Sequence, residues 1–195
     1  MTTHAANRTL DAFASQLRLG LMGSLLIVSP LFVAAQQADQ ARAGEHAEHA
    51  SPAKLVEIVR EATRQFIDVN NAGPAGYEPF LGCVSGQDHG AMGVHYVNGT
   101  LVGDGKIDAT QPEALIYEPM NGKMRLVGVE YIVDAATWLA SNLGPPVLEG
   151  QTFLLVTSPN RYNIPSFFEL HVWAWRDNPQ GAFVDWNNRV TCEGQ

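Results

Sequence analysis

The chain begins with a polar stretch that is followed by an almost uninterrupted apolar run over residues 19–35. A polar, arginine-containing start before such a run is typical of an export signal, so the sequence predicts a signal peptide over 1–35. Small residues with the spacing that signal peptidase accepts predict cleavage between Ala35 and Ala43. An uncleaved membrane anchor is the alternative, because the apolar run approaches the shortest length that spans a bilayer.

The next two segments differ sharply in pattern. Residues 36–52 are small, polar and aperiodic, which predicts a flexible spacer, because such a segment buries too little apolar area to become ordered. Residues 53–195 are predicted to form a single globular domain. Over 55–69 apolar positions recur every three or four residues, with charges on the other side, which predicts an amphipathic helix lying on a core. Asn, Gly and Pro in 70–74 end it.

From Tyr77 onward the apolar residues fall in short runs divided by Gly, Pro, Asn and Asp, a pattern typical of strands. The dipeptide Asn121-Gly122 joins two such runs and predicts an antiparallel hairpin, because Asn-Gly fits a type I′ turn. The sequence therefore predicts an α+β fold, with the N-terminal amphipathic helix packed on an antiparallel β-sheet or small β-barrel of about six strands. The predicted strands cover residues 93–97, 113–118, 124–133, 152–157, 167–175 and 182–186.

The charge of the chain excludes two classes of partner. The formal net charge is −8, and the lysines and arginines stand singly rather than in a basic stripe. Nucleic acid is therefore excluded, since binding to phosphates depends on clustered Lys and Arg. An anionic membrane surface is excluded for the same reason, which leaves an uncleaved leader as the one predicted contact with a membrane.

The two cysteines, Cys83 and Cys192, both follow the predicted leader. In an exported protein an even pair is typically a disulfide, so the sequence predicts a Cys83–Cys192 bond and a periplasmic or secreted location. Two separate buried thiols are the alternative. The long spacing excludes a Cys-x-x-Cys redox motif.

The predicted strand 167–175 has one aliphatic face and one polar, aromatic face, because side chains alternate along a strand. Two indoles on one face indicate either a lined cavity or a surface for a partner. The polar, aromatic face carries Glu169, His171, Trp173 and Trp175.

Glutamates in otherwise apolar strands provide the remaining candidate ligands. Glu113, Glu118 and Glu130 would each need a metal, a cation or hydrogen bonds if buried. If His95 and His171 meet one or two of them, the set forms a mixed N/O site suited to a divalent metal such as zinc, iron or manganese. The alternative is that both histidines are core residues hydrogen-bonded to Glu and Tyr neighbours. The predicted metal- or ligand-binding residues are His95, His171, Glu118, Glu130, Trp173 and Trp175.

Three functions are compatible with these residues. The first is a binding module for a small molecule or divalent metal in a cavity lined by His, Glu and Trp. The second is a metal-assisted hydrolase or oxygenase in which a glutamate is the general acid or base. The third is a structural or interaction protein of the cell envelope, which would use the face of Trp173 and Trp175. The sequence contains no Walker nucleotide-binding loop, no Gly-x-Ser-x-Gly nucleophile motif and no His-Glu-x-x-His zinc-protease motif, so it assigns no catalytic residue.

Several runs of the sequence carry a resemblance to a known group of proteins. They are MGVHYVN at 92–98, PEALIYE at 112–118, VEY at 129–131, LHVWAW at 170–175 and NPQG at 178–181, with Trp186-Asn187 and Cys192 beyond them. Together they resemble a family of uncharacterised exported bacterial proteins, over nearly all of the predicted domain. The resemblance implies one fold unit that ends at the last cysteine, and it implies no activity. Asn188 stands where that pattern has a proline.

Overall fold

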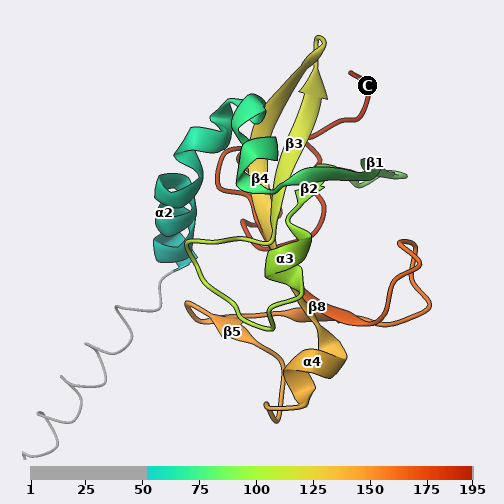
Figure 1. Ribbon diagram of the computed structural model, residues 1–195. Coiled ribbons are helices and arrows are strands. Elements are labelled where there is room, and N and C mark those ends of the chain that lie inside the picture. The colour runs from blue at the N-terminus through green and yellow to red at the C-terminus, as the bar shows by residue number, and fades with distance from the viewer. Residues whose placement is uncertain (1–51, 195) are drawn as a thin grey trace, which may run out of the picture. The chain divides into compact units, whose positions relative to one another are not determined.

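The computed structural model describes residues 52–194 (Figure 1). The predicted signal peptide 1–35, and the predicted spacer up to residue 51, lie outside the described residues. None of the helices between residues 52 and 194 is both long and apolar enough to cross a membrane.

The described part opens with helix α2, Pro52–Thr63. Leu55 and Val59 are fully buried on the face of α2 that contacts the core. After Thr63 the chain continues in short 3-10 turns, and Phe66 packs its ring edge-on against Tyr77 at 5.3 Å. The apolar face predicted over 55–69 is thus divided between a true α-helix and looser turns.

A six-stranded antiparallel sheet forms the centre of the domain, as the sequence predicts, and it curls into an open half-barrel (Figure 1). Asn121 and Gly122 connect β3 and β4 with φ of 52° and 73°, which confirms the predicted hairpin with a type I′ turn. In spatial order the strands are β1 (Glu78–Gly86), β2 (Gly90–Val97), β3 (Ala114–Met120), β4 (Lys123–Asp134), β8 (Phe167–Val172) and β7 (Leu154–Val156). The smaller elements are α3 (Gly99–Val102), α4 (Ala135–Leu139) and the pair β5 (Val147–Leu148) and β6 (Gln151–Thr152).

Several segments differ from the predicted strands. The predicted strand 152–157 is divided between β6, which ends at Thr152, and β7, which begins at Leu154 in the other sheet, and the predicted strand 167–175 ends at Val172. Residues 182–186 form turns and not a strand, because the carbonyls of Ala182 and Val184 accept hydrogen bonds from the backbone and indole N–H of Trp173. Strand β1 was not predicted. Its register shifts between Phe80 and Val84, where Leu81 has a φ of 60°, and this bulge removes the alternation that marks a strand.

The two faces of the sheet have different roles. One face packs on α2 through aliphatic and aromatic side chains of β3, β4 and β8, including Val129, Tyr131 and Leu170. The opposite, concave face carries His95, Glu130 and His171, the cluster described below. The core beneath α2 and the His/Glu cluster therefore lie on opposite faces of the sheet.

The predicted disulfide is confirmed: Cys83 in β1 is bonded to Cys192. It ties one edge of the sheet to the C-terminal segment, which also meets β2 through an isolated bridge between Ala91 and Asn187. The C-terminal residues are thereby held against the sheet.

Candidate metal centre

Three strands bring the central cluster together. His171 on β8 lies directly opposite Glu130 on β4, so their side chains share a face. His95 comes from β2, two strands from β4, and reaches them because the sheet curls. Gly128 on β4 leaves no room for a side chain, because an added Cβ would be only 2.7 Å from the Val172 carbonyl oxygen. One ligand atom each of His95, Glu130 and His171 lies within 4.8 Å of the others.

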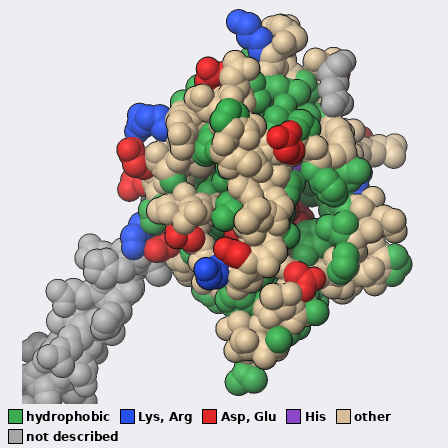
Figure 2. Space-filling view, in the orientation of Figure 1, with side chains coloured by type: hydrophobic (Ala, Val, Ile, Leu, Met, Phe, Trp, Pro, Cys, Tyr) green, Lys and Arg blue, Asp and Glu red, His purple; other side chains and the backbone are tan. Residues whose placement is uncertain are grey.

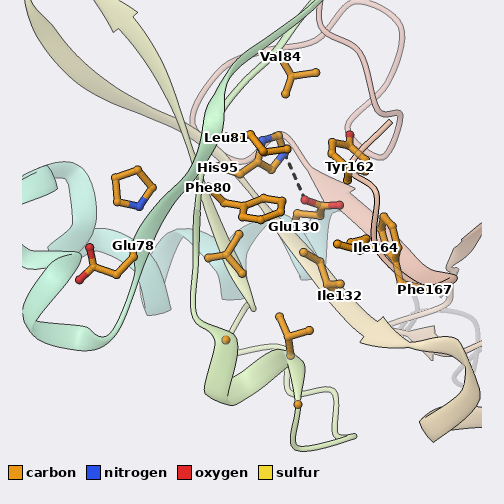
Figure 3. Close-up of a pocket in the computed structure, with 15 residues that line it drawn as sticks. Glu78, Phe80, Leu81, Val84, His95, Glu130, Ile132, Tyr162, Ile164 and Phe167 are labelled. Carbon is orange, nitrogen blue, oxygen red and sulfur yellow. Dashed lines mark ion pairs between the residues drawn. The ribbon is translucent and has the colours of Figure 1, made fainter. Parts of the chain in front are cut away.

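His95 and Glu130 form the more closely spaced half of the cluster (Figure 3). Their Nε2 and Oε2 atoms are 3.2 Å apart, and both side chains are buried. That distance would suit an ion pair, but burial disfavours charge on both groups. Burial lowers the pKa of His95 to about 4, although a hydrogen bond to the Gly93 backbone opposes the shift. At neutral pH the imidazole is therefore uncharged and keeps a nitrogen lone pair.

His171 is the unusual member of the cluster. It is 1% exposed, and neither ring nitrogen has a hydrogen-bond partner among the described residues. Burial, and then the nearby His95, lower its pKa well below the usual value. Its ring stacks on Trp173 at 25° with centroids 6.2 Å apart, and its Nδ1 is 3.7 Å from Oδ1 of Asp185. A buried neutral imidazole is thus fixed in place with its nitrogens unused.

Acidic groups surround that imidazole. Glu130 and Glu169 share a hydrogen bond, and burial followed by the Glu169 charge raises the pKa of Glu130 well above its usual value. Burial also raises the pKa of Glu169 to about 7, and the bond from Glu130 opposes that shift. Both carboxyl groups are therefore harder to ionise than a free glutamate. Glu169, His171 and Asp185 form a second group whose ligand atoms lie within 4.8 Å of one another.

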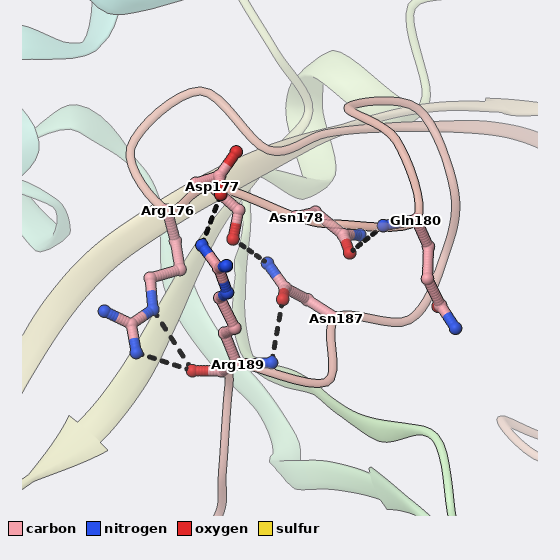
Figure 4. Close-up of polar contacts among 6 residues, drawn as sticks. All are labelled: Arg176, Asp177, Asn178, Gln180, Asn187 and Arg189. Carbon is pink, nitrogen blue, oxygen red and sulfur yellow. Dashed lines mark hydrogen bonds and ion pairs between the residues drawn. The ribbon is translucent and has the colours of Figure 1, made fainter.

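Asp185 comes from the loop after β8, which a polar network holds in place (Figure 4). Asn178 donates from Nδ2 to the Trp186 carbonyl oxygen at 2.9 Å. Its Oδ1 accepts from the Gln180 N–H. Asn187, fully buried, accepts from the Arg189 N–H at 2.9 Å. Trp173 donates from its indole nitrogen to Val184, next to Asp185. These bonds position the carboxylate beside His171.

The structure brings together four of the six predicted site residues: His95, Glu130, His171 and, beside them, Trp173. Glu118 lies elsewhere, and its Oε1 accepts the Thr191 N–H at 3.1 Å under the C-terminal segment.

Trp175 lies on the side of α2, where its indole donates to Thr63 Oγ1 at 3.0 Å. Strand β8 ends at Val172, and the N–H groups of Trp175 and Arg176 both donate to the Val127 carbonyl oxygen, which breaks the alternation. Trp173 and Trp175 therefore do not form one surface.

Sequence reasoning left three nearby residues out of the site. Strand alternation already places Glu169 on the face of His171, and that signal was available. Asp185 and Tyr162 belong to loops, where no periodic signal exists. Tyr162 directs its hydroxyl toward Met92 Sδ at 3.6 Å, and burial, with the charges of Glu130 and Glu169 adding to it, raises its pKa.

The cluster lies between two cavities. A cavity of about 440 Å³ reaches His95 and Glu130 and is otherwise bordered mainly by apolar side chains (Figure 3). The surface drawn in Figure 2 is hollowed between groups of such side chains. A second cavity of about 410 Å³ is bordered by Glu169, His171 and Asp185. The two groups of the cluster therefore adjoin different cavities.

Comparisons with known proteins give no further assignment: no family model, no curated protein and no solved structure matches this chain.

Proposed function

We propose that this domain binds one divalent transition-metal ion through His95, Glu130 and His171. The observation that carries the proposal is the fully buried His171, which has no hydrogen-bond partner among the described residues. Leaving a buried polar group without a partner costs about 1–3 kcal/mol. A metal ion would use the lone pair of His171, and the charge of the ion would offset the surrounding carboxylates.

The alternative of two hydrogen-bonded core histidines accounts for only half of the cluster. His95 does have Glu130 at 3.2 Å and the Gly93 backbone as neighbours. Within the described residues His171 makes no hydrogen bond, yet three carboxylates lie around it. Neutral imidazoles and carboxylates are the ligands that zinc, iron and manganese share, so the donor set supports these metals and not calcium or magnesium, which prefer oxygen alone.

Metal analysis of the purified protein tests this proposal. We expect about one zinc, iron(II) or manganese ion per chain. His171→Ala and His95→Ala should each weaken metal binding by more than 100-fold, because loss of a residue that only hydrogen-bonds a metal ligand already costs about 10- to 100-fold. His89→Ala is the matched control, because His89 is an exposed histidine outside the cluster, and it should bind metal like the parent protein. Circular dichroism verifies the fold of each variant. Equal metal content in the parent and in folded His171→Ala would reject the site.

Asp185 is expected to act on the metal through His171. A carboxylate beside the second nitrogen of a ligating imidazole fixes its tautomer and orientation, and Asp185 stands 3.7 Å from His171 Nδ1. Asp185→Asn should therefore weaken metal binding about 10- to 100-fold without abolishing it. Calorimetric titration with zinc measures the effect. Asp177→Asn, at an exposed position in the same loop, should leave the affinity unchanged; equal losses in both variants would point to a disturbed loop.

We also propose that the domain acts outside the cytoplasm, in the periplasm or as a secreted protein. The Cys83–Cys192 bond supports this location, because disulfides persist in oxidising compartments. The leader pattern of residues 1–35 agrees with it. Cell fractionation followed by N-terminal sequencing of the exported form tests the location.

A further inference from the structure

The cavity beside His95 and Glu130 has most of its polar side chains in one place. There it meets the two proposed metal ligands and the side chain of Tyr162 (Figure 3). Glu78, the other acidic residue on its wall, lies apart from them (Figure 3). The remaining side chains of the wall are apolar, among them Phe80, Val97, Val102, Ile132, Ile164 and Phe167.

We propose that this cavity binds an apolar small molecule, aromatic or alkyl, whose oxygen-donor head group completes the coordination of the metal. The inference rests on the proposed metal centre, and it names the class of ligand that the centre receives. Three protein ligands leave at least one position open on a tetrahedral ion. The apolar wall then holds the rest of the molecule.

The size of the cavity limits the ligand. A water molecule occupies about 30 Å³ in the liquid, so 440 Å³ corresponds to about 15 water-sized atoms. This lies within the range of cavities that hold one small organic molecule. The second cavity is a poorer place for an apolar tail, because its wall includes Gln151, Thr152 and Gln180 beside the acidic groups.

Tyr162 identifies the head group as a hydrogen-bond acceptor. Its hydroxyl lies on the same cavity wall as His95 and Glu130. Its present acceptor is a methionine sulfur at 3.6 Å, which is a weak one. An oxygen bound to a metal between His95 and Glu130 would be a stronger acceptor for that hydroxyl.

Straight-chain hydroxamates are suitable probes, because their oxygens bind transition metals and their tails can be lengthened one methylene at a time. The purified protein is loaded with cobalt(II), whose visible spectrum changes when a new oxygen ligand binds. We expect the dissociation constant to fall about fourfold per added methylene from acetohydroxamate onward, as for transfer into an apolar site, and to level off once the cavity is full. The metal-free protein should bind the same probes far more weakly.

Two substitutions separate the head group from the tail. Tyr162→Phe should weaken every hydroxamate about two- to tenfold, because one hydrogen bond is lost. Val97→Phe fills the cavity, so it should weaken octanohydroxamate at least tenfold and acetohydroxamate hardly at all. Val147→Phe is the control, because Val147 is 61% exposed and lies outside the cavity wall.

The outcomes distinguish this inference from the metal centre itself. Failure of cobalt to bind would overturn the metal centre and this inference with it. Normal cobalt binding with no effect of chain length would overturn the inference alone. Equal hydroxamate binding with and without cobalt would also overturn it, because the head group would then not reach the metal.

Discussion

Replacing Cys83 and Cys192 together by serine is expected to lower the free energy of unfolding by about 4 to 5 kcal/mol. The two half-cystines are 109 residues apart, and closing so long a loop removes much of the entropy of the unfolded chain. That loss is a large share of the 5–15 kcal/mol that stabilises a typical domain. Urea denaturation of the parent and of the double variant, at one protein concentration, measures the difference in midpoint and slope.

Reduction of the parent protein with dithiothreitol provides the control for this prediction, because it breaks the bond without changing any side chain volume. The reduced protein should unfold at the urea concentration of the double variant. A double variant as stable as the oxidised protein would contradict the role of the bond, and it would show that the C-terminal segment is held by its other contacts, such as the bridge from Ala91 to Asn187.

Metal affinity is expected to rise about tenfold per pH unit between pH 5 and 7. Burial and the charge of Glu169 raise the pKa of Glu130 well above its usual value, so an ion that binds Glu130 must displace its proton across this range. His95 adds no pH dependence in this window, because its pKa is lowered to about 4 and it is already neutral. Calorimetric titrations with zinc across this pH range measure the slope.

The proton itself can be counted. Titration at pH 6 in two buffers that differ in enthalpy of ionisation should show the release of about one proton per metal ion. Glu169→Gln provides the comparison, because it removes one member of the pair and leaves the three proposed ligands in place. Affinity that does not change between pH 5 and 7 in the parent protein would show that the metal does not bind at Glu130.

In strand β8 the alternation of side chains predicts the correct face for some residues and the wrong face for Trp175. Alternation correctly groups Glu169, His171 and Trp173, because side chains on a regular strand point to opposite faces in turn. The same rule fails two residues later at Trp175, since the backbone leaves the sheet after Val172 and both following N–H groups converge on one carbonyl. A break of this kind depends on the hydrogen bonds that the neighbouring strand offers, and the sequence of the strand does not record them.

The sequence by itself determined the features that depend on neighbouring residues or on residue type alone: the antiparallel sheet of the α+β fold, the hairpin at Asn121-Gly122 and the Cys83–Cys192 bond. Only the tertiary structure decided that His95 meets His171 across the curled sheet, that Asp185 reaches them from a loop, and that an apolar cavity adjoins the cluster. The physical reason is that the curl of the sheet and the placement of loops depend on packing and hydrogen bonds between residues far apart in the chain. The spacing of apolar residues and the residue types of a turn, in contrast, act over a few neighbouring residues.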